Sequence, residues 1–354
     1  MSGRAPLSDT AVRVDRYAGE RDAWDAFVAR SPSSTFFHRS TWLDVVEQTF
    51  GYGRHDLVAR RGGHIVGILP LCEVPRPFGR ACLMSLPFAV QAGVCADDGE
   101  ARQALDAEAL ALGLQRKAEY VELRDGPGGD GFRAREGVYF GFRRALHAND
   151  EDNLRSVPRK QRRMIRVGQR SGLRAEVGPA HLGAFHDLYA RTARRLGSPV
   201  FAVGYFRLLL DTLGDDCVLM TVWQGGVAVA GVLSFFFRDT VLPYYAGSRR
   251  DMLRFAPNDF LYWELMRHAV RRGARAFDFG RSKVGSGPFA FKRHWGFVPE
   301  PQRYRVCAFG NDPPVRSLDD PWVRWLRRCW SQMPLSLTKV AGPMLIRRLG
   351  PYYT

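Results

Sequence analysis

The sequence predicts an α+β protein made of two similar halves, and three observations support this. The chain has 354 residues, which is enough for two domains of ordinary size. Both halves show helices, a strand pair around a Gly-Gly turn, a further strand, a long helix and a short strand, in that order. The segment LVARRGGHIVGILPL also resembles LMTVWQGGVAVAGVLSF. A repeat of this length indicates duplication of one α/β unit rather than a solenoid of short repeats.

The first half shows strong signals for regular structure. Apolar residues at helical spacing, followed by runs rich in β-branched residues, separate its helices from its strands. We expect helices over 21–29, 41–51 and 100–118, and strands over 55–61, 64–74, 81–88 and 119–125. The Gly-rich segment Gly126–Gly131, which contains Pro127, is expected to form a flexible loop.

The second half repeats this order. We expect helices over 180–197, 203–214 and 258–274, a hairpin over 217–237, and strands over 240–248 and 275–280. Aligning ALGLQRKAEYVELRD with MRHAVRRGARAFDFGRS sets Glu122 opposite Asp278. We therefore expect a first domain over 12–147, a second over 148–310 and a C-terminal tail over 311–354.

Composition excludes several classes of protein. Hydrophobic residues make up 45% of the chain and charged residues 25%, as in soluble globular proteins. No run approaches the ~20 apolar residues that cross a bilayer, and the N-terminus has no apolar segment like that of a secretion signal. We expect a cytoplasmic protein, free or peripheral on the inner face of the membrane. The six cysteines are scattered and the histidines lack ligand spacing, so we expect no metal and no tightly bound cofactor.

The net charge of +16 points to an anionic partner, such as a phosphorylated substrate, tRNA or an acidic membrane surface. The alternative is a genome that uses Arg freely on solvated surfaces. The segment Arg155–Arg174 is rich in Arg and Lys and has no acidic residue. If helical, it presents cations on nearly every face, and Lys160 and Arg163 are candidates for binding phosphate. A solvated helix at the domain boundary is the competing interpretation, although like charges at i, i+4 repel.

The tail mixes Trp, Leu and Arg. An apolar face of one helix is formed by Trp322, Trp325, Leu326, Cys329 and Trp330, which follow i, i+3, i+4, i+7, i+8 spacing. One interpretation is that this helix docks back on the first half. The other is that residues 321–349 form a basic amphipathic surface that touches anionic lipid.

Six segments in fixed order carry a resemblance to a known family. They are Phe36–Trp42, Pro158–Arg166, Arg194–Pro199, Tyr244–Ser248, Phe277–Ser282 and Phe291–Phe297. Over about residues 12–310 the chain resembles the Fem family of transferases, and most closely its branch associated with exosortase (PEP-CTERM) and exopolysaccharide loci. That resemblance implies two tandem GNAT-like acyltransferase domains. Well-known Fem enzymes attach amino acids from aminoacyl-tRNA to peptidoglycan precursors.

The resemblance also implies roles for particular residues. The family's Phe-Lys pair at the reaction centre matches Phe291 and Lys292, and its acceptor-phosphate Arg matches Arg195, with Arg194 as an alternative register. The chain departs from the family in two ways. Val46 stands where the family has an acceptor-binding Lys, and the helical arm of some tRNA-using members is absent. Both departures weaken the case for tRNA and the UDP-muramoyl peptide as substrates. They do not weaken the expectation of acyl transfer itself.

The residues themselves offer candidates for the chemistry. Acyl transfer to an amine needs an uncharged nucleophile, a positioned donor and stabilisation of an oxyanion. Lys292 is a candidate cation for the oxyanion or a donor phosphate, against the alternative of a surface lysine at a strand edge. Asp278 is a candidate proton acceptor, or a cap of the following loop. One of Tyr244 and Tyr245 is expected to face the site and donate a proton, while the other packs in the core.

The loop Gly280–Gly287 supplies further candidate binding residues. Its glycines allow a close backbone approach to an anion, and Arg281, Ser282 and Lys283 add donors and charge. The usual CoA-binding turn of GNAT enzymes is missing before the helix at 258–274. Asn258 is expected to cap that helix, and Asp259 opposes a pyrophosphate there. We therefore do not expect CoA to be held in the usual way.

Together these observations predict an N-acyltransferase or aminoacyltransferase. Its acceptor would be an amine on an anionic, phosphorylated or lipid-linked envelope or exopolysaccharide precursor, and its donor aminoacyl-tRNA or an acyl thioester on a carrier. The main alternative is a non-catalytic basic adaptor that binds anionic lipid or polymer. A third interpretation, nucleic-acid binding for its own sake, has charge in its favour but no recognised motif.

Overall fold

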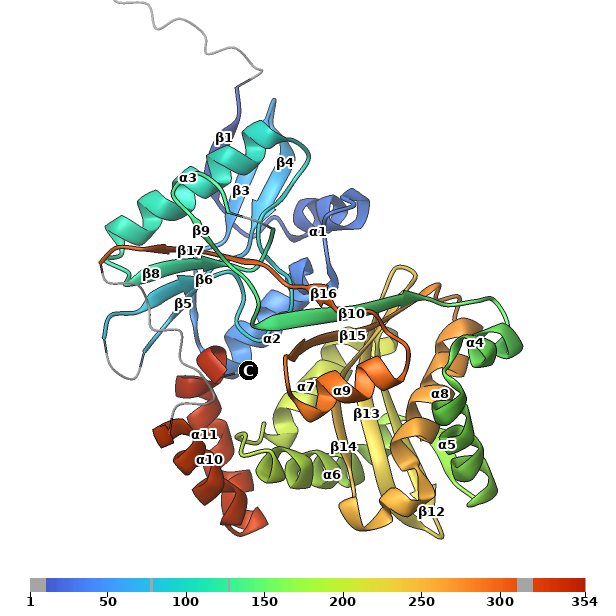
Figure 1. Ribbon diagram of the computed structural model, residues 1–354. Helices are drawn as coiled ribbons and strands as arrows, with labels where there is room; N and C mark the ends of the chain where they lie inside the picture. Colours follow the sequence, from blue (N-terminus) through green and yellow to red (C-terminus); the bar gives the residue numbers. More distant parts are fainter. Residues whose placement is uncertain (1–10, 77–78, 127, 311–320, 354) are drawn as a thin grey trace, which may run out of the picture. The chain divides into compact units, whose positions relative to one another are not determined.

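The computed structural model describes residues 11–76, 79–126, 128–310 and 321–353 (Figure 1). Pro127 and residues 311–320 of the expected tail lie outside the described residues. The prediction of an α+β protein is confirmed. The chain forms two compact units, which divide at 136/137 and 302/303, whereas we expected boundaries at 147/148 and 310/311. The residues from Arg303 return to the first unit, and the C-terminal helices belong to the second.

The first unit contains two sheets and three helices. The helices are α1 (Arg21–Arg30), α2 (Ser40–Phe50) and α3 (Gly99–Gln115). One sheet has the order β1-β3-β4-β7, formed by β1 (Arg13–Arg16), β3 (Leu57–Arg61), β4 (His64–Leu69) and β7 (Cys95–Ala96). The other has the order β2-β5-β6-β8-β17-β9, formed by β2 (Gly53–Arg54), β5 (Cys72–Val74), β6 (Cys82–Met84), β8 (Tyr120–Leu123), β17 (Tyr304–Ala308) and β9 (Arg133–Arg135). Asp98 begins α3 by accepting a hydrogen bond from the N–H of Ala101.

The second unit is built on one sheet of seven strands, in the order β11-β12-β13-β14-β15-β10-β16. These strands are β11 (Arg174–Val177), β12 (Cys217–Gln224), β13 (Val227–Phe237), β14 (Thr240–Ser248), β15 (Ala276–Lys283), β10 (Tyr139–Ala145) and β16 (Glu300–Pro301). Its helices are α4 (Asp150–Ser156), α5 (Arg159–Arg170), α6 (Leu182–Arg195), α7 (Val203–Leu213), α8 (Pro257–Arg271), α9 (Gly287–His294), α10 (Pro321–Gln332) and α11 (Leu335–Tyr353). Figure 1 shows α6 and α7 on one side of this sheet and α5 and α8 on the other.

Two strands cross between the halves of the sequence. β10 follows the last elements of the first half, yet it pairs antiparallel with β15 of the second unit. β17 follows the second half, yet it pairs antiparallel with β8 of the first unit. Each unit therefore completes its main sheet with a strand from the other half of the chain. We predicted no strand from the sequence at either place.

The close packing of α6 on β14 depends on one small residue. A Cβ built on Gly247 of β14 would lie 2.4 Å from both the carbonyl carbon of Leu188 and the backbone nitrogen of Tyr189. Because those atoms belong to the backbone of α6, they cannot move aside as a flexible side chain would. Gly247 thus sets the distance between helix and strand.

The C-terminal helices pack on α6 and on the segment that follows it. The indole N–H of Trp330 donates to the carbonyl of Ser198 at 2.8 Å, and Arg327 donates to the carbonyl of Leu196 at 2.6 Å. Lys339 of α11 pairs with Asp187 of α6 at 2.9 Å. One of our two interpretations had the tail helix docking on the first half; the contacts described above are with α6 of the second unit and the segment after it.

Replacing Gly247 with alanine should destabilise the second unit. The new methyl group would overlap the α6 backbone, and overpacking of this kind costs about 1–3 kcal/mol. The free energy of unfolding, measured by urea titration, should fall by that amount. Gly183→Ala is the matched control, because it lies in α6 with open space around it and should be neutral or stabilising by up to about 1 kcal/mol. Equal stability of the two variants would contradict the packing argument.

Candidate functional site

The candidate site begins at a fork between two parallel strands of the second unit. β14 and β15 are paired only at their starts, where Thr240 faces Ala276 and Val241 faces Phe277. Beyond this point β14 stays paired with β13 and β15 stays paired with β10. A fork of this kind directs the backbone of two strand edges toward the same space, where an extended ligand finds hydrogen-bond partners.

A bulge lies on the β14 side of this fork. Leu233 of β13 faces Tyr245, and the next residue, Ser234, faces Pro243, so Tyr244 is the extra residue. Bulges change the direction of a side chain and are frequent beside functional sites. Tyr244 is half-buried, next to the ring of Phe235.

The neighbouring tyrosine packs in the core. The Tyr245 hydroxyl shares a hydrogen bond of 2.8 Å with the Tyr205 hydroxyl, and its ring contacts Phe206. Burial raises the pKa of both hydroxyls well above the usual value. Tyr245 therefore behaves as the core-packing member of the pair, which leaves Tyr244 as the candidate proton donor.

The β15 side of the fork carries a second bulge, held by Lys292. Phe279 and Gly280 together face one residue of β10, and Gly280 has a φ of +64° that glycine adopts without strain. The Lys292 ammonium donates to the carbonyls of Phe279 at 2.6 Å, Arg281 at 3.1 Å and Gly280 at 3.4 Å. The side chain of Lys292 therefore ties α9 to the bulge.

Lys292 is unusual in its electrostatics as well as its contacts. The residue is only 8% exposed, so the alternative of a surface lysine at a strand edge is wrong. Burial lowers the pKa of its ammonium to about 7, the positive charge of Arg281 adds to this effect, and the carboxylate of Asp278 opposes it. Near neutral pH this buried group is poised between its charged and uncharged forms.

Asp278 lies beside this lysine on β15. Its carboxylate accepts a hydrogen bond of 2.7 Å from the N–H of Gly280, so it caps the start of the bulge, as one of our two interpretations proposed. Burial raises the pKa of the Asp278 carboxyl, while the Gly280 N–H, Arg143 and Lys292 oppose that rise. A carboxyl with a raised pKa is a candidate for proton transfer as well as for capping.

The expected anion-binding loop is more ordered than the sequence suggested. β15 continues to Lys283, and α9 begins at Gly287 with Ser286 as its cap, since the Ser286 hydroxyl accepts from the N–H of Phe289. Arg281 stacks on the ring of Tyr139 at 4.5 Å, and Ser282 is buried.

Phe291 belongs to the aromatic packing beneath the site. Its ring lies 5.5 Å from that of Tyr262 and 6.0 Å from that of Trp295. The two residues of the Phe-Lys pair thus have different roles. The ring of Phe291 packs against the core, and the ammonium of Lys292 binds the carbonyls of the bulge.

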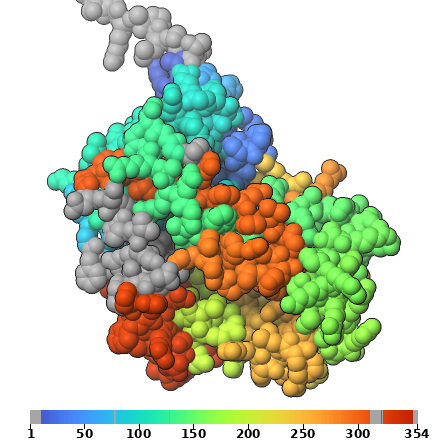
Figure 2. All heavy atoms as spheres, in the orientation of Figure 1, coloured from blue at the N-terminus to red at the C-terminus, as the bar shows by residue number. Residues whose placement is uncertain are grey.

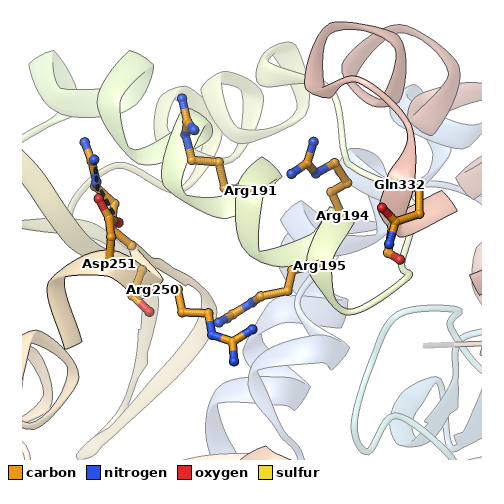
Figure 3. A pocket seen from close by; sticks show the side chains of 9 residues that line it. Arg191, Arg194, Arg195, Arg250, Asp251 and Gln332 are labelled. Carbon is orange, nitrogen blue, oxygen red and sulfur yellow. Dashed lines mark hydrogen bonds and ion pairs between the residues drawn. The ribbon is translucent and has the colours of Figure 1, made fainter. Parts of the chain in front are cut away.

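A strongly basic pocket lies in the same unit, at the end of β14 (Figure 3). It has a volume of about 560 Å³ and is formed by α6, the end of β14, the 3₁₀ turn η4 (Arg250–Phe255) and the end of α10. We call it the arginine pocket; it is lined by Arg191, Arg194, Arg195, Ser248, Arg249, Arg250, Asp251, Ser331 and Gln332. Both expected acceptor-phosphate residues, Arg194 and Arg195, are in it.

The charges in this pocket are only partly balanced. Arg191 pairs with Asp187 and Arg249 with Asp251, each at 2.6 Å. Among the described residues, Arg195 and Arg250 have no ion-pair partner, and Figure 3 shows their side chains directed toward each other. Two unpaired guanidinium groups that face one cavity repel each other and favour an anionic ligand with several oxygen acceptors.

The N-terminus of α8 offers little to an anion. α8 begins at Pro257 after Ala256, which has a left-handed φ of +51°, so the expected cap by Asn258 is wrong. Asp259 sits in the first turn and accepts from the indole N–H of Trp295 at 3.0 Å, and burial raises the pKa of Asp259 to about 6. Its carboxylate thus takes the place near the helix dipole that a phosphate would need.

The basic helix α5 has one buried face that carries no cation. Ile165 and Gly168 are buried, and Gly168 lies against Phe260 of α8, so the expectation of cations on nearly every face is wrong. Lys160 and Arg163 are exposed and line neither the fork nor the arginine pocket. The structure therefore does not bring these two candidates together with the others.

The equivalent fork in the first unit is closed. β6 and β8 are also parallel, but the chain after β6 remains bound to β8: the N–H of Ser85 donates to the carbonyl of Glu122, and the N–H of Arg124 donates to the hydroxyl of Ser85. The Arg124 guanidinium fills the space, donating to Glu122 and to the carbonyl of Ala89. The open fork thus belongs to the second unit.

Sequence reasoning missed part of the arginine pocket. Arg249 and Arg250 follow the YYAGS segment directly, and Arg191 precedes Arg194 and Arg195 at i, i+3 and i+4 spacing on one helix face. The sequence therefore contained signals for these arginines. It contained none for Ser331 and Gln332, because their place in the pocket depends on the docking of α10.

Comparisons with known proteins find similarity to acyltransferases. Residues 152–293 match the family described as acetyltransferase (GNAT) domain. A lipid II:glycine glycyltransferase of Staphylococcus epidermidis is 21% identical over 366 residues, covering 77% of this chain and 87% of the relative.

Solved structures share the fold. The crystal structure of FemX superposes with a TM-score of 0.67 at 18% identity, covering 82% of this chain and 96% of that one. A tandem GNAT protein from the clavulanic acid biosynthesis pathway superposes with a TM-score of 0.53 at 15% identity, covering 85% of this chain and all of the other.

The buried ammonium of Lys292 should show itself in the pH dependence of stability. Its pKa is about 7 in the folded protein and about 10.4 in an unfolded chain. Between these values the unfolded state binds one proton more, so the free energy of unfolding rises with pH, by up to about 1.4 kcal/mol per pH unit. Lys292→Met, which carries no titrating proton, should remove this rise.

The measurement is a set of urea titrations between about pH 7 and pH 10. Lys117→Met, at an exposed lysine of the first unit, is the control and should keep the wild-type slope. If Lys292→Met kept the same slope as the wild type, the lysine would not be the buried titrating group described above.

Proposed function

We propose that this chain, an acyltransferase of the GNAT type with distant similarity to the lipid II:glycine glycyltransferases, transfers an acyl or aminoacyl group to an amine of an anionic cell-envelope or exopolysaccharide precursor. The observation that carries the proposal is the arginine pocket at the end of β14, the strand that also forms one side of the open fork. The fork suits an extended acyl donor, and the pocket suits the phosphate of a substrate.

The donor side of the proposal rests on the fork. A donor lying along the separated edges of β14 and β15 receives main-chain hydrogen bonds, as in the addition of a strand to a sheet edge. Its acyl carbonyl then lies near the bulge at Tyr244, whose hydroxyl is our candidate for returning a proton to the leaving group. Both aminoacyl-tRNA and a carrier-bound acyl thioester present such an extended activated group.

Lys292 and Asp278 act on the second side of the fork. Lys292 is a positioning residue in this proposal, because its ammonium holds the carbonyls that shape the bulge. Asp278, with its raised pKa, is the candidate acceptor for the proton that the attacking amine loses. The nitrogen–carbon bond forms as the bond from the acyl carbon to the donor breaks, and the proton passes from the amine to the leaving group.

The acceptor side rests on charge. Arg195 and Arg250 would hold a phosphate or diphosphate, with Arg194 beside them. A precursor linked to lipid or nucleotide through phosphate carries such a group. The exosortase-associated setting is one place for such a precursor and is supported by the six ordered sequence segments alone. The similarity to acyltransferases favours an enzyme over the non-catalytic basic adaptor.

Arg195→Gln and Arg250→Gln should each raise the KM for a phosphorylated acceptor. Loss of a charge-assisted hydrogen bond costs about 1.5–3 kcal/mol, which corresponds to roughly 10- to 100-fold. kcat should change little, because the pocket binds a part of the acceptor away from the reacting amine. The measurement is acyl transfer to an amine acceptor with and without its phosphate, with Arg207→Gln, an exposed arginine of α7, as the control.

Two results separate binding from misfolding. Against the acceptor without phosphate, both variants should match the wild type. The unliganded variants should also be at least as thermally stable as the wild type, because each substitution removes one of two unpaired like charges. An equal loss on both acceptors would contradict phosphate binding in this pocket.

A further inference from the structure

The two C-terminal helices have an outer face that the packing on α6 leaves uncovered. Trp330 and Ile346 are buried on the inner face. On the outer face, Val340 is 74% exposed and Met344 is 73% exposed, which is unusual for side chains of this size. Among the side chains that the structure describes in α10 and α11, the exposed large apolar ones are Trp325, Leu326, Leu337, Val340 and Met344.

Positive charge surrounds these apolar side chains. Residues 321–353 contain no Asp or Glu. They contain six basic residues, Arg324, Arg327, Arg328, Lys339, Arg347 and Arg348. Arg327 and Lys339 are engaged with α6 and the segment after it, whereas Arg324, Arg328, Arg347 and Arg348 are exposed. Residues 321–353 thus combine exposed apolar side chains with exposed basic ones and contain no acidic residue of their own.

We propose that this outer face docks on an anionic membrane surface while the inner face stays packed on α6. Apolar side chains would enter the boundary between headgroups and acyl chains, and the exposed arginines would contact lipid phosphates. No helix among the described residues is long and apolar enough to cross a membrane. The mixture of apolar and basic side chains on the outer face fits attachment in the plane of the interface. Docking on protein and contact with lipid are then properties of opposite faces of the same helices.

The same helices reach the arginine pocket. Ser331 and Gln332 line that pocket, a few residues along α10 from the exposed Trp325. The partly buried hydrogen bonds from Trp330 to the carbonyl of Ser198 and from Arg194 to the carbonyl of Met333 connect the two regions. A docked outer face would therefore hold the pocket close to the headgroup layer, where the phosphate of a lipid-linked substrate lies. The proposal goes beyond acyl transfer and stands without it, because it concerns binding to lipid alone.

The test is flotation of the full chain with vesicles of phosphatidylcholine alone and of phosphatidylcholine with phosphatidylglycerol. The wild type should float with the phosphatidylglycerol vesicles only, and less so as salt is raised. The variant Trp325→Ser/Val340→Ser/Met344→Ser should lower the partition coefficient on the order of 100-fold, since it removes three exposed apolar side chains. Leu114→Ser/Val298→Ser is the matched control, because both residues are exposed apolar side chains outside these helices, and should bind as the wild type does.

Charge is tested separately. Arg324→Gln/Arg328→Gln, at two exposed arginines of α10, should weaken binding roughly 25-fold, from about 1 kcal/mol per charge near an anionic surface. Arg207→Gln/Arg271→Gln, at two exposed arginines of α7 and α8, should not. All these substitutions are at exposed positions, and unchanged circular dichroism would show that the fold is kept. Absence of wild-type flotation, or equal losses in the variants and their controls, would overturn the proposal whatever the result for acyl transfer.

Discussion

The exchange of β10 and β17 is the constraint on which the rest of the molecule depends. Neither half of the chain supplies its own strand for the free edge of β8 or β15. An unpaired edge there would leave a row of buried N–H and C=O groups without partners. β10 directly precedes the other elements of the second unit in sequence, whereas β17 follows that whole unit. Completion of the first unit therefore depends on residues beyond the second, so we expect the two units to fold cooperatively. The bulge at Gly280 lies in the pairing of β15 with β10.

The second unit differs from the first in its charged groups. Lys292 contributes a buried charge that three carbonyls hold in place, and Arg195 and Arg250 contribute two charges that no carboxylate among the described residues balances. Isolated buried or repelling charges cost folding free energy. In the first unit the buried Arg305 is neutralised, because it pairs with Asp106 and Asp125. The unbalanced charge is therefore concentrated in the unit whose fork is open, which is the pattern of a binding site for anions.

Much of the local structure could be predicted from the sequence. The helices at 100–118 and 258–274 and the hairpin around Gly225 and Gly226 were right to within a few residues, because propensity and periodicity act over short distances. The exchanged strands were missed because their partners lie in the other half of the sequence. Asn258 was wrongly assigned as a cap because Ala256 takes the left-handed conformation and Pro257 starts the helix.

In the site, too, residues within one sequence segment could be predicted, whereas contacts between distant segments could not. Arg194 and Arg195 could be named from a sequence segment, whereas their neighbour Gln332 arrives from α10 only through tertiary packing. The burial of Lys292 was also invisible in the sequence, since a lysine after a Gly-rich loop is ordinarily exposed. A sequence can name residue types for a reaction, but the partners that change their pKa depend on the fold.

The central claim, transfer of an acyl group to an envelope precursor, is tested most directly by mass spectrometry of lipid-linked precursors and envelope polysaccharide. Extracts of cells with the gene, without it, and with the gene restored as wild type or as Arg195→Gln/Arg250→Gln would be compared. The account predicts that one acyl or aminoacyl mass is lost with the gene, returns with the wild type, and returns weakly with the double variant. Identical masses in all four extracts would contradict it.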